Sequence, residues 1–278
     1  AVTDRRRFVW IVALIAFINV VYKGVVDLYD VRITRADAPP AVAKALAGTK
    51  IVFLSDIHVR SIGARERFVL DLIERESPDY VLIAGDLKPY EGSAEPSLEF
   101  FRRIRARRGA YAVLGDAEYR LGSQNCVYCH ASGSWAIRDD LPVRVLRDRT
   151  VTLAGADGEP AVDLWAGDVK LHPSLDWAQR GARPVIAMAH LPESFPDYAT
   201  AGADLMLAGD THGGQSWLPR PLYALVLGRE KARWLRGRYA LGDSVMWVNA
   251  GLGWTGLPLR FGVKPEVVIF DFRDDANR

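Results

Sequence analysis

Aspartate and histidine residues recur in this chain in five short segments whose composition suits metal chemistry. The segments are Ser55-Asp56-Ile57-His58, Gly85-Asp86, Gly115-Asp116-Ala117-Glu118, the single His190, and Gly209-Asp210-Thr211-His212-Gly213-Gly214-Gln215. Asp and His are ligands for hard-to-borderline divalent ions, and Gly lets the backbone approach an ion closely. One Asp-x-His or one Gly-Asp alone would carry no information, but five such segments in this order predict a metal site.

Each of these segments follows a run of apolar, partly β-branched residues that predicts a buried strand. The five runs are Ile51–Leu54, Tyr80–Ala84, Ala110–Leu114, Val185–Ala189 and Asp204–Ala208. Between them, Glu66–Glu76 has apolar residues at helical spacing, which predicts a helix facing the core. Strands alternating with helices indicate a layered α/β fold, with central β-sheets flanked by helices and the ligands at strand ends.

With these motifs the chain resembles the calcineurin-like metallophosphoesterases, and among them the membrane-anchored bacterial branch that includes the UDP-2,3-diacylglucosamine hydrolases. The resemblance runs from about Ala47 to Phe272. It includes the C-terminal segments Val248-Asn249-Ala250-Gly251-Leu252-Gly253, Leu257-Pro258-Leu259-Arg260-Phe261 and Pro265-Glu266. It implies that a metal-bound hydroxide hydrolyses a phosphodiester or pyrophosphate, and it suggests a lipid-linked substrate of the UDP-diacylglucosamine type.

The resemblance also implies two sets of metal ligands that share one carboxylate. One ion would be held by four residues: Asp56, His58, Asp86 and His212. A second ion would share Asp86 and take three further residues: Asp116, His190 and Asp210. Because Asp210 offers oxygen where the family has a histidine nitrogen, the expected cofactor is one or two Mn²⁺, Fe or Mg²⁺ ions rather than Zn²⁺.

Three positions depart from the family motifs. Asp116 stands where the family has Asn, Asp210 stands where it has His, and Ala117 replaces a His that contacts the phosphate and aids departure of the leaving group. Four carboxylates around two divalent ions would bring the charge of the site from about +2, as in the family, to about zero. Without any ion, these carboxylates would repel one another and raise one another's pKa values.

Loss of the motif histidine removes a general-acid contribution of roughly 10²–10⁴-fold. A good leaving group, such as a nucleotide phosphate, would tolerate this loss. Two nearby residues, Glu118 and His130, are candidates to fill the position. The expected catalytic residues are therefore four: Asp86, Asp116, Glu118 and His130.

Cys126-Val127-Tyr128-Cys129-His130 contains both cysteines of the chain. Three interpretations are open: a local disulfide, a metal or c-type haem site that includes His130, and two free thiols. Covalent haem at Cys126 and Cys129 would make the chain a redox protein. Another hypothesis for the function of the whole chain is a non-catalytic metal-binding relative that acts as a scaffold or sensor. Ala117 and Asp210 favour it.

The N-terminus is a separate apolar element. Arg5-Arg6-Arg7 precedes Phe8–Tyr22, in which only Asn19 is polar. A membrane span needs about 20 residues, so the span would continue through Lys23. We interpret 1–29 as an uncleaved anchor in a bacterial inner membrane rather than a signal peptide, because no small-x-small cleavage site follows at the right distance. The segment 30–46 is expected to be a linker and 47–278 the catalytic domain.

The positive-inside rule would keep the arginines in the cytoplasm and place the domain in the periplasm or otherwise outside the cytoplasm. A helix that only lies in the membrane interface would leave the domain on the cytoplasmic face.

A second apolar stretch, Trp217–Leu227, follows the last motif and is itself followed by several Arg and Lys residues. This composition suits contact with anionic headgroups or acyl chains, and a core helix with a basic exposed face is the alternative. The net charge of +2 gives no argument for nucleic acid as a partner. The expected partners are a membrane and a phosphorylated, lipid-linked small molecule.

Overall fold

The apolar segments form strands that are buried on both faces. In β2 (Lys50–Leu54) and β3 (Tyr80–Ala84) every residue is buried. Parallel strands of this kind need cover on each side, which explains their near-continuous apolar sequence. The five strands that the sequence predicts are present, each with bounds that agree within one residue.

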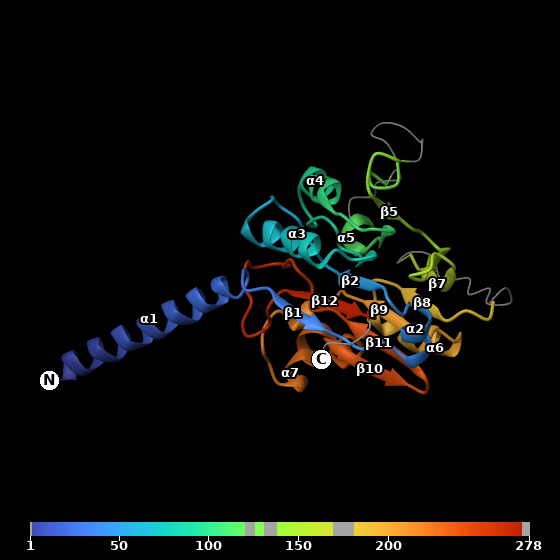
Figure 1. Ribbon diagram of the computed structural model, residues 1–278. Coiled ribbons are helices and arrows are strands. Elements are labelled where there is room, and N and C mark those ends of the chain that lie inside the picture. The colour runs from blue at the N-terminus through green and yellow to red at the C-terminus, as the bar shows by residue number, and fades with distance from the viewer. Residues whose placement is uncertain (1, 120–125, 131–137, 169–180, 274–278) are drawn as a thin grey trace.

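The computed structural model describes residues 2–119, 126–130, 138–168 and 181–273. In these residues two six-stranded sheets lie against each other, with helices on the outer faces (Figure 1). The first sheet has the strand order β1 (Arg32–Arg35), β12 (Glu266–Asp271), β2, β3, β4 (Gly109–Val113), β5 (Val143–Val145). The second has the order β10 (Gly237–Leu241), β11 (Ser244–Val248), β9 (Leu205–Ala208), β8 (Val185–Met188), β7 (Pro160–Ala166), β6 (Arg149–Ala154).

The helices are short apart from the first. They are α1 (Val2–Val26), α2 (Pro40–Ala45), α3 (Ala64–Glu76), α4 (Glu95–Arg103), α5 (Asp116–Tyr119), α6 (Phe195–Thr200), α7 (Arg220–Leu227) and α8 (Arg229–Arg233), with 3₁₀ turns η2 (Pro192–Ser194) and η3 (His212–Gly214). The predicted helix Glu66–Glu76 corresponds to α3, and it buries Val69, Leu72 and Ile73.

Side-chain alternation along the strands divides the interior into layers. In β2, Ile51 and Phe53 belong to the core between the two sheets, whereas Val52 and Leu54 belong to the core beneath α3 and α4. A third apolar cluster lies between the second sheet and α6. The predicted layered α/β architecture, with central sheets flanked by helices, is confirmed.

The parallel strands bring the candidate ligands to one region. Strands β2, β3 and β4 run parallel in the first sheet, and β8 and β9 run parallel in the second. The polar segments follow the carboxyl ends of these strands, the place where α/β sheets hold their ligands.

Residues 30–46 were expected to be a linker, but they are part of the folded domain. Strand β1 pairs in parallel with β12, from Arg32 opposite Glu266 to Arg35 opposite Ile269. After it, α2 buries Val42 in the core between the sheets. The long-range partner of β1 lies more than 200 residues away, so local composition does not reveal this strand.

Helix α1 projects away from the body of the protein (Figure 1). Its segment Arg5–Val26 is 22 residues long and apolar enough to cross a membrane, and only 6% of its most apolar window is buried. The base of α1 is held by the domain, because the Arg260 backbone NH donates to the Gly24 carbonyl at 2.9 Å. The Gly262 backbone NH likewise donates to the buried carboxylate of Asp27 at 2.9 Å.

Candidate metal centre

The loops after the strands turn sharply at the candidate ligands. Five of these residues adopt positive φ angles: Asp56 (45°), His58 (42°), Asp86 (50°), Asp210 (72°) and His212 (50°). Left-handed backbone is uncommon and costly for residues with a side chain, and it concentrates at functional sites. Two features require glycine at position 85. Its φ is 81°, and a Cβ there would collide with the ring of His190.

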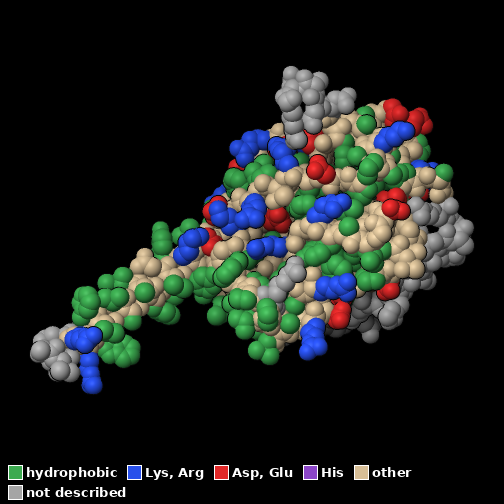
Figure 2. Space-filling model, turned by 90° about the horizontal axis from the view of Figure 1, so that it is seen from below, with side chains coloured by type: hydrophobic (Ala, Val, Ile, Leu, Met, Phe, Trp, Pro, Cys, Tyr) green, Lys and Arg blue, Asp and Glu red, His purple; other side chains and the backbone are tan. Residues whose placement is uncertain are grey.

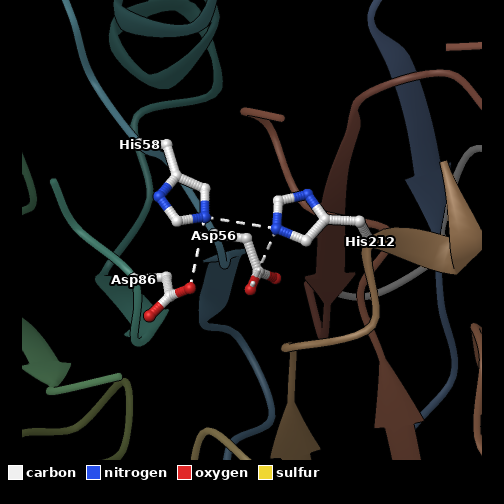
Figure 3. A group of neighbouring side chains, drawn as sticks. All are labelled: Asp56, His58, Asp86 and His212. Atoms are coloured by element: carbon white, nitrogen blue, oxygen red, sulfur yellow. Dashed lines mark hydrogen bonds and ion pairs between the residues drawn. The ribbon is translucent and has the colours of Figure 1, made fainter. Parts of the chain in front are cut away.

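Four ligands gather at the first group, which consists of Asp56, His58, Asp86 and His212 (Figure 3). The Nε2 atoms of His58 and His212 face each other at 3.2 Å. His58 Nε2 lies 3.2 Å from Asp86 Oδ2, and His212 Nε2 lies 3.8 Å from Asp56 Oδ1. All four side chains are buried, so two nitrogens and two carboxylates converge on one point shielded from water.

Backbone carbonyls orient the histidine rings. His58 Nδ1 donates to the Lys88 carbonyl at 2.8 Å, and His190 Nδ1 donates to the Ala84 carbonyl at 3.0 Å. A proton held on Nδ1 leaves the Nε2 lone pair free to bind a metal ion, which is how ligating histidines are commonly fixed.

The second group consists of Asp86, Asp116 and His190. His190 Nε2 lies 3.4 Å from Asp86 Oδ1 and 3.6 Å from Asp116 Oδ1. Asp116 differs from the others because its side chain is 46% exposed. This group therefore opens to solvent, whereas the first is closed.

Asp210, expected as the fourth ligand of the second ion, belongs to neither group. Its Oδ1 accepts a hydrogen bond from Lys231 Nζ at 2.7 Å, and its nearest ring nitrogen is His190 Nε2 at 3.9 Å. The lysine comes from α8 and is half-buried. The net charge of about zero expected from the sequence did not include Lys231. Its ammonium offsets the charge of Asp210, so the site with two divalent ions would have a net charge of about +1.

The electrostatics of the cluster favour cations. Burial raises the pKa of Asp56 to about 6, with His190 lowering it and Asp86 raising it. Burial alone would lower the pKa of His190, but the Asp86, Asp116 and Asp56 carboxylates hold it well above its usual value. Burial and the neighbouring His58 and Arg260 hold the pKa of His212 well below its usual value. Without an ion, protons therefore occupy part of the space that a cation would take.

Two buried atoms show that the residues present fit a bound cation. His190 Nε2 and Asp210 Oδ2 are inaccessible to water and have no hydrogen-bond partner among the described residues. Buried polar atoms are rarely left without a partner. Imidazole nitrogens together with carboxylate oxygens are ligands for divalent transition-metal ions. The residues that could hold divalent ions are thus those of the two groups, with Asp210 at their edge.

Glu118 supports the loops instead of facing the two groups. Its Oε1 accepts backbone NH groups from Leu87 at 3.0 Å and Lys88 at 3.2 Å, and its Oε2 accepts the Gly115 NH at 2.7 Å. Burial, followed by the charge of Asp86, raises the pKa of Glu118 to about 7 against the effect of these amides. The expected catalytic role does not fit a carboxylate whose two oxygens both hold the backbone.

Ala117 is fully buried on α5, and its backbone NH donates to Asp86 Oδ1 at 3.0 Å. Ala117, which stands where the family has a histidine, therefore orients the shared Asp86 carboxylate through its backbone NH. A histidine side chain there would have to displace its neighbours. Tyr90 brings a hydroxyl to this part of the site and donates to Asp116 Oδ1 at 2.8 Å. Burial and the charge of Asp86 raise the pKa of Tyr90.

The C-terminal motif covers the Asp56–His58 loop. Leu252 NH donates to the Ser55 carbonyl at 3.1 Å, and Gly253 NH donates to the Asp56 carbonyl at 2.7 Å. The fully buried Arg260 donates to the Gly253 carbonyl at 2.6 Å and lies 3.3 Å from His212 Nδ1. Arg260 thus fixes the loop that packs on the first group.

Roles for Tyr90, Lys231 and Arg260 at the metal centre were not predicted from the sequence, which placed Lys231 only among the basic residues suited to anionic headgroups. Tyr90 follows the Gly85-Asp86 motif by four residues, a position that could have drawn attention to it. Arg260 lies inside the C-terminal segment that carries the resemblance. Lys231 had no such signal, because only the packing of α8 brings it to Asp210.

Cys126 and Cys129 form a disulfide. Both sulfurs are then engaged, so neither is available to attach haem. Tyr128 anchors the segment, since its hydroxyl bonds to Ser97 Oγ at 2.6 Å within the core beneath α4. His130 is half-buried, with its backbone NH donating to the Cys126 carbonyl at 2.9 Å, and it belongs to neither ligand group. His172, the remaining histidine, lies outside the described residues.

Comparison with known proteins agrees with this geometry. Residues 49–214 match the family described as calcineurin-like phosphoesterase. The chain is 27% identical over 237 residues to YkuE, an uncharacterized metallophosphoesterase of Bacillus subtilis, which covers 81% of this chain and 79% of that protein. It is 27% identical over 236 residues to the phosphodiesterase YaeI of Escherichia coli, covering 80% and 81%.

A further relative comes from Danio rerio and is named a transmembrane protein with metallophosphoesterase domain. It is 26% identical over 242 residues, which cover 81% of this chain and 53% of that protein. This chain therefore spans about half of that relative's length.

Proposed function

Because the chain belongs to the calcineurin-like phosphoesterase family, we propose that it hydrolyses a phosphodiester or pyrophosphate at the centre formed by the two ligand groups. The observation that carries this proposal is the convergence of both groups on Asp86, from five strand ends in two sheets. Divalent ions held there would activate water and stabilise charge on the phosphoryl oxygens. We favour Mn²⁺, iron or Mg²⁺ because Asp116 and Asp210 add oxygen ligands.

The residues of this chain have distinct tasks in such a reaction. Asp86 is shared by both groups and is held by the Ala117 backbone NH. Asp116 lies on the solvent-facing side, where a substrate would enter. Tyr90 lies beside Asp116, and Lys231 lies beside Asp210. Both side chains can donate hydrogen bonds to a phosphoryl oxygen. They supply donors in the region where the family histidine is missing.

The finer proposal is that the protein is a membrane-anchored enzyme with a lipid-linked substrate. Helix α1 has the length and composition of an anchor, and a Danio rerio relative is named a transmembrane protein. The apolar helix α7 begins eight residues after His212. A substrate of the UDP-diacylglucosamine type would place its acyl chains in the bilayer and its phosphorus at the metal centre. Orientation with the domain outside the cytoplasm follows from the basic residues that precede the anchor.

The first experiment compares wild-type protein, Asp86→Asn and Asp71→Asn in Mn²⁺-dependent hydrolysis of bis(4-nitrophenyl) phosphate. Asp71 is an exposed residue of α3, so its substitution controls for loss of one carboxylate. We expect Asp86→Asn to lose at least roughly 100-fold in kcat, since it disturbs both groups, and Asp71→Asn to retain activity. No turnover by any of the three with Mn²⁺, Fe²⁺ or Mg²⁺ would contradict the proposal.

That negative result would favour the second candidate function, a metal-binding scaffold or sensor. The specific observation in its favour is the buried Ala117 in place of the motif histidine. The lipid-linked substrate has its own test, in which pyrophosphate-linked lipids in vesicles compete with the soluble ester. Hydrolysis of small soluble esters alone, with no binding to vesicles, would rule the lipid substrate out.

A further inference from the structure

Helix α7 exposes its apolar side chains to solvent. Leu225 is 82% exposed, Val226 71% and the preceding Trp217 71%. Among the residues of α7 whose burial is described, only Tyr223 is buried. The alternative interpretation of this stretch as a core helix is therefore wrong. Contiguous exposed apolar side chains mark a contact surface for another molecule or for a membrane.

Tyr223 ties α7 to the metal centre. Its ring lies against Gly214, where any side chain would collide with it. Its hydroxyl accepts the Leu218 backbone NH at 3.0 Å and donates to the Ser216 carbonyl. Gly214 ends the η3 turn that begins at His212. The apolar helix is thus fixed to the same loop that carries a candidate metal ligand.

The loop that contains Phe261 contacts both the segment before α7 and the base of α1. Trp217 NH donates to the Phe261 carbonyl at 2.6 Å, and Phe261 NH donates to the Gln215 carbonyl at 2.9 Å. On its other side the Phe261 ring lies against Gly24 of α1. Viewed from below, hydrophobic side chains gather on the body next to the point where α1 joins it, with Lys and Arg side chains nearby (Figure 2).

We propose that Trp217, Leu222, Leu225 and Val226, here called the α7 surface, insert into the bilayer that α1 crosses. Each of these side chains is exposed. The proposal rests on the membrane anchor proposed above and not on hydrolysis. An anchor whose base contacts the same loop as Trp217 brings the α7 surface to the level of the membrane interface, where Trp and aliphatic side chains partition well.

Charge favours a lipid surface over a second copy of this chain. Arg229 and Arg233 of α8 are exposed beside the α7 surface, and Glu230 is the acidic residue of that helix. Anionic headgroups attract such basic residues. Two copies docked face to face through α7 would instead bring these arginines near the same arginines of the other copy, and the like charges would repel. Insertion of α7 would hold His212 and its neighbours close to the headgroup layer, where the phosphorus of a lipid substrate lies.

The test places an environment-sensitive NBD fluorophore on three variants of the full chain with one added cysteine each: Leu225→Cys in the α7 surface, Ile15→Cys in α1 and Asp157→Cys. Asp157 is exposed in the turn of the β6–β7 hairpin, and β7 lies on the side of the domain away from α1 (Figure 1). Labelling under non-reducing conditions preserves the disulfide between Cys126 and Cys129. Each protein is reconstituted into phosphatidylcholine–phosphatidylglycerol vesicles with or without nitroxide-labelled lipid.

We expect nitroxide lipids to quench the fluorophores at 225 and 15 at least about twofold more than the one at 157. Quenching at 15 with residue 225 equal to residue 157 would overturn the α7 proposal and leave the anchor intact. Absence of quenching at both 15 and 225 would overturn both. Protection of residue 225 from aqueous iodide without quenching by lipid would show that another protein surface covers α7, which also overturns the proposal. None of these outcomes depends on whether the protein hydrolyses a phosphoester.

Discussion

The two ligand groups that share Asp86 differ in burial and in charge. The first closes two histidines and two carboxylates away from water, and its rings and loops are held by the Lys88 carbonyl and by Arg260. The second has one histidine, the half-exposed Asp116, and an aspartate at its edge that is paired with Lys231. A preformed, dry group binds an ion with little reorganisation, whereas an open one must order its ligands against water. We therefore expect the first group to bind its ion more tightly and the second to exchange its ion and contact substrate.

The largest effect should come from a matched pair of substitutions, Asp56→Asn in the first group and Asp116→Asn in the second. Asp56→Asn should weaken binding of the tight ion by at least about 100-fold, more than the roughly 10–100-fold lost when a residue that only orients a ligand is changed. Asp116→Asn installs the residue type of the family motif, so it should leave the tight ion in place. Calorimetric titration with Mn²⁺ gives both affinities. Equal losses in the two variants would break the distinction between the groups.

The second prediction concerns pH and the metal-free protein. Folding raises the pKa of Asp56 from 3.8 to about 6, so its contribution to stability is complete below pH ~4 and is lost as pH rises through about 6. This amounts to roughly 2–3 kcal/mol. His58 and His190 also have raised pKa values and act in the same direction above pH 6.5, whereas the lowered pKa of His212 acts in the opposite direction below pH 6.5.

Taken together, the folded metal-free site holds more protons than the unfolded chain. The midpoint of thermal unfolding in EDTA should therefore fall as pH rises from 5 to 8. Mn²⁺ should stabilise the protein more at pH 8 than at pH 5, because an ion displaces these protons. A midpoint in EDTA that rises over this range would show that the cluster does not hold protons in this way.

Lys231→Met should produce a smaller change confined to the second group. Removing the ammonium frees Asp210 Oδ1, so the second ion should bind about tenfold more tightly, within the 0.5–3 kcal/mol typical of coupled neighbours. The KM for substrate should rise because one positive charge is lost. Arg229→Met, in the same helix, is the control. If Asp210→Asn in the Lys231→Met background leaves the second ion unchanged, the lysine does not act through Asp210.

Tyr90→Phe should give the smallest effect. It removes the hydroxyl that donates to Asp116 Oδ1 at 2.8 Å, and water can replace this bond at a half-exposed carboxylate. We expect the affinity of the second ion to fall by about 3–10-fold, less than the roughly 10–100-fold typical of residues that orient a ligand, with the first ion unaffected. Tyr29→Phe, at an exposed position, is the control. A loss of the first ion in Tyr90→Phe would mean that the groups are not separable.

The location of the ligands at strand ends could be predicted from local sequence, and their division into two groups was implied by the family resemblance. A buried apolar run predicts a strand, and a polar residue directly after it must lie at the end of that strand. The first group has the four residues implied by the family motifs, and the second has three of its four. The segment 30–46 could not be predicted in the same way, since β1 pairs with β12, whose residues are more than 200 positions away in the sequence.

Five of the strands, the order of the motif segments and the apolar N-terminal helix could be read from the amino-acid sequence, since each depends on consecutive residues. Lys231 neutralises Asp210 from 21 residues away, and Arg260 reaches His212 from 48 residues away, because the tertiary structure brings them together. The tertiary structure also decided that α7 faces outward beside the base of α1. These contacts join loops and short helices whose relative positions are set by packing of the two sheets, and no local periodicity encodes that distance.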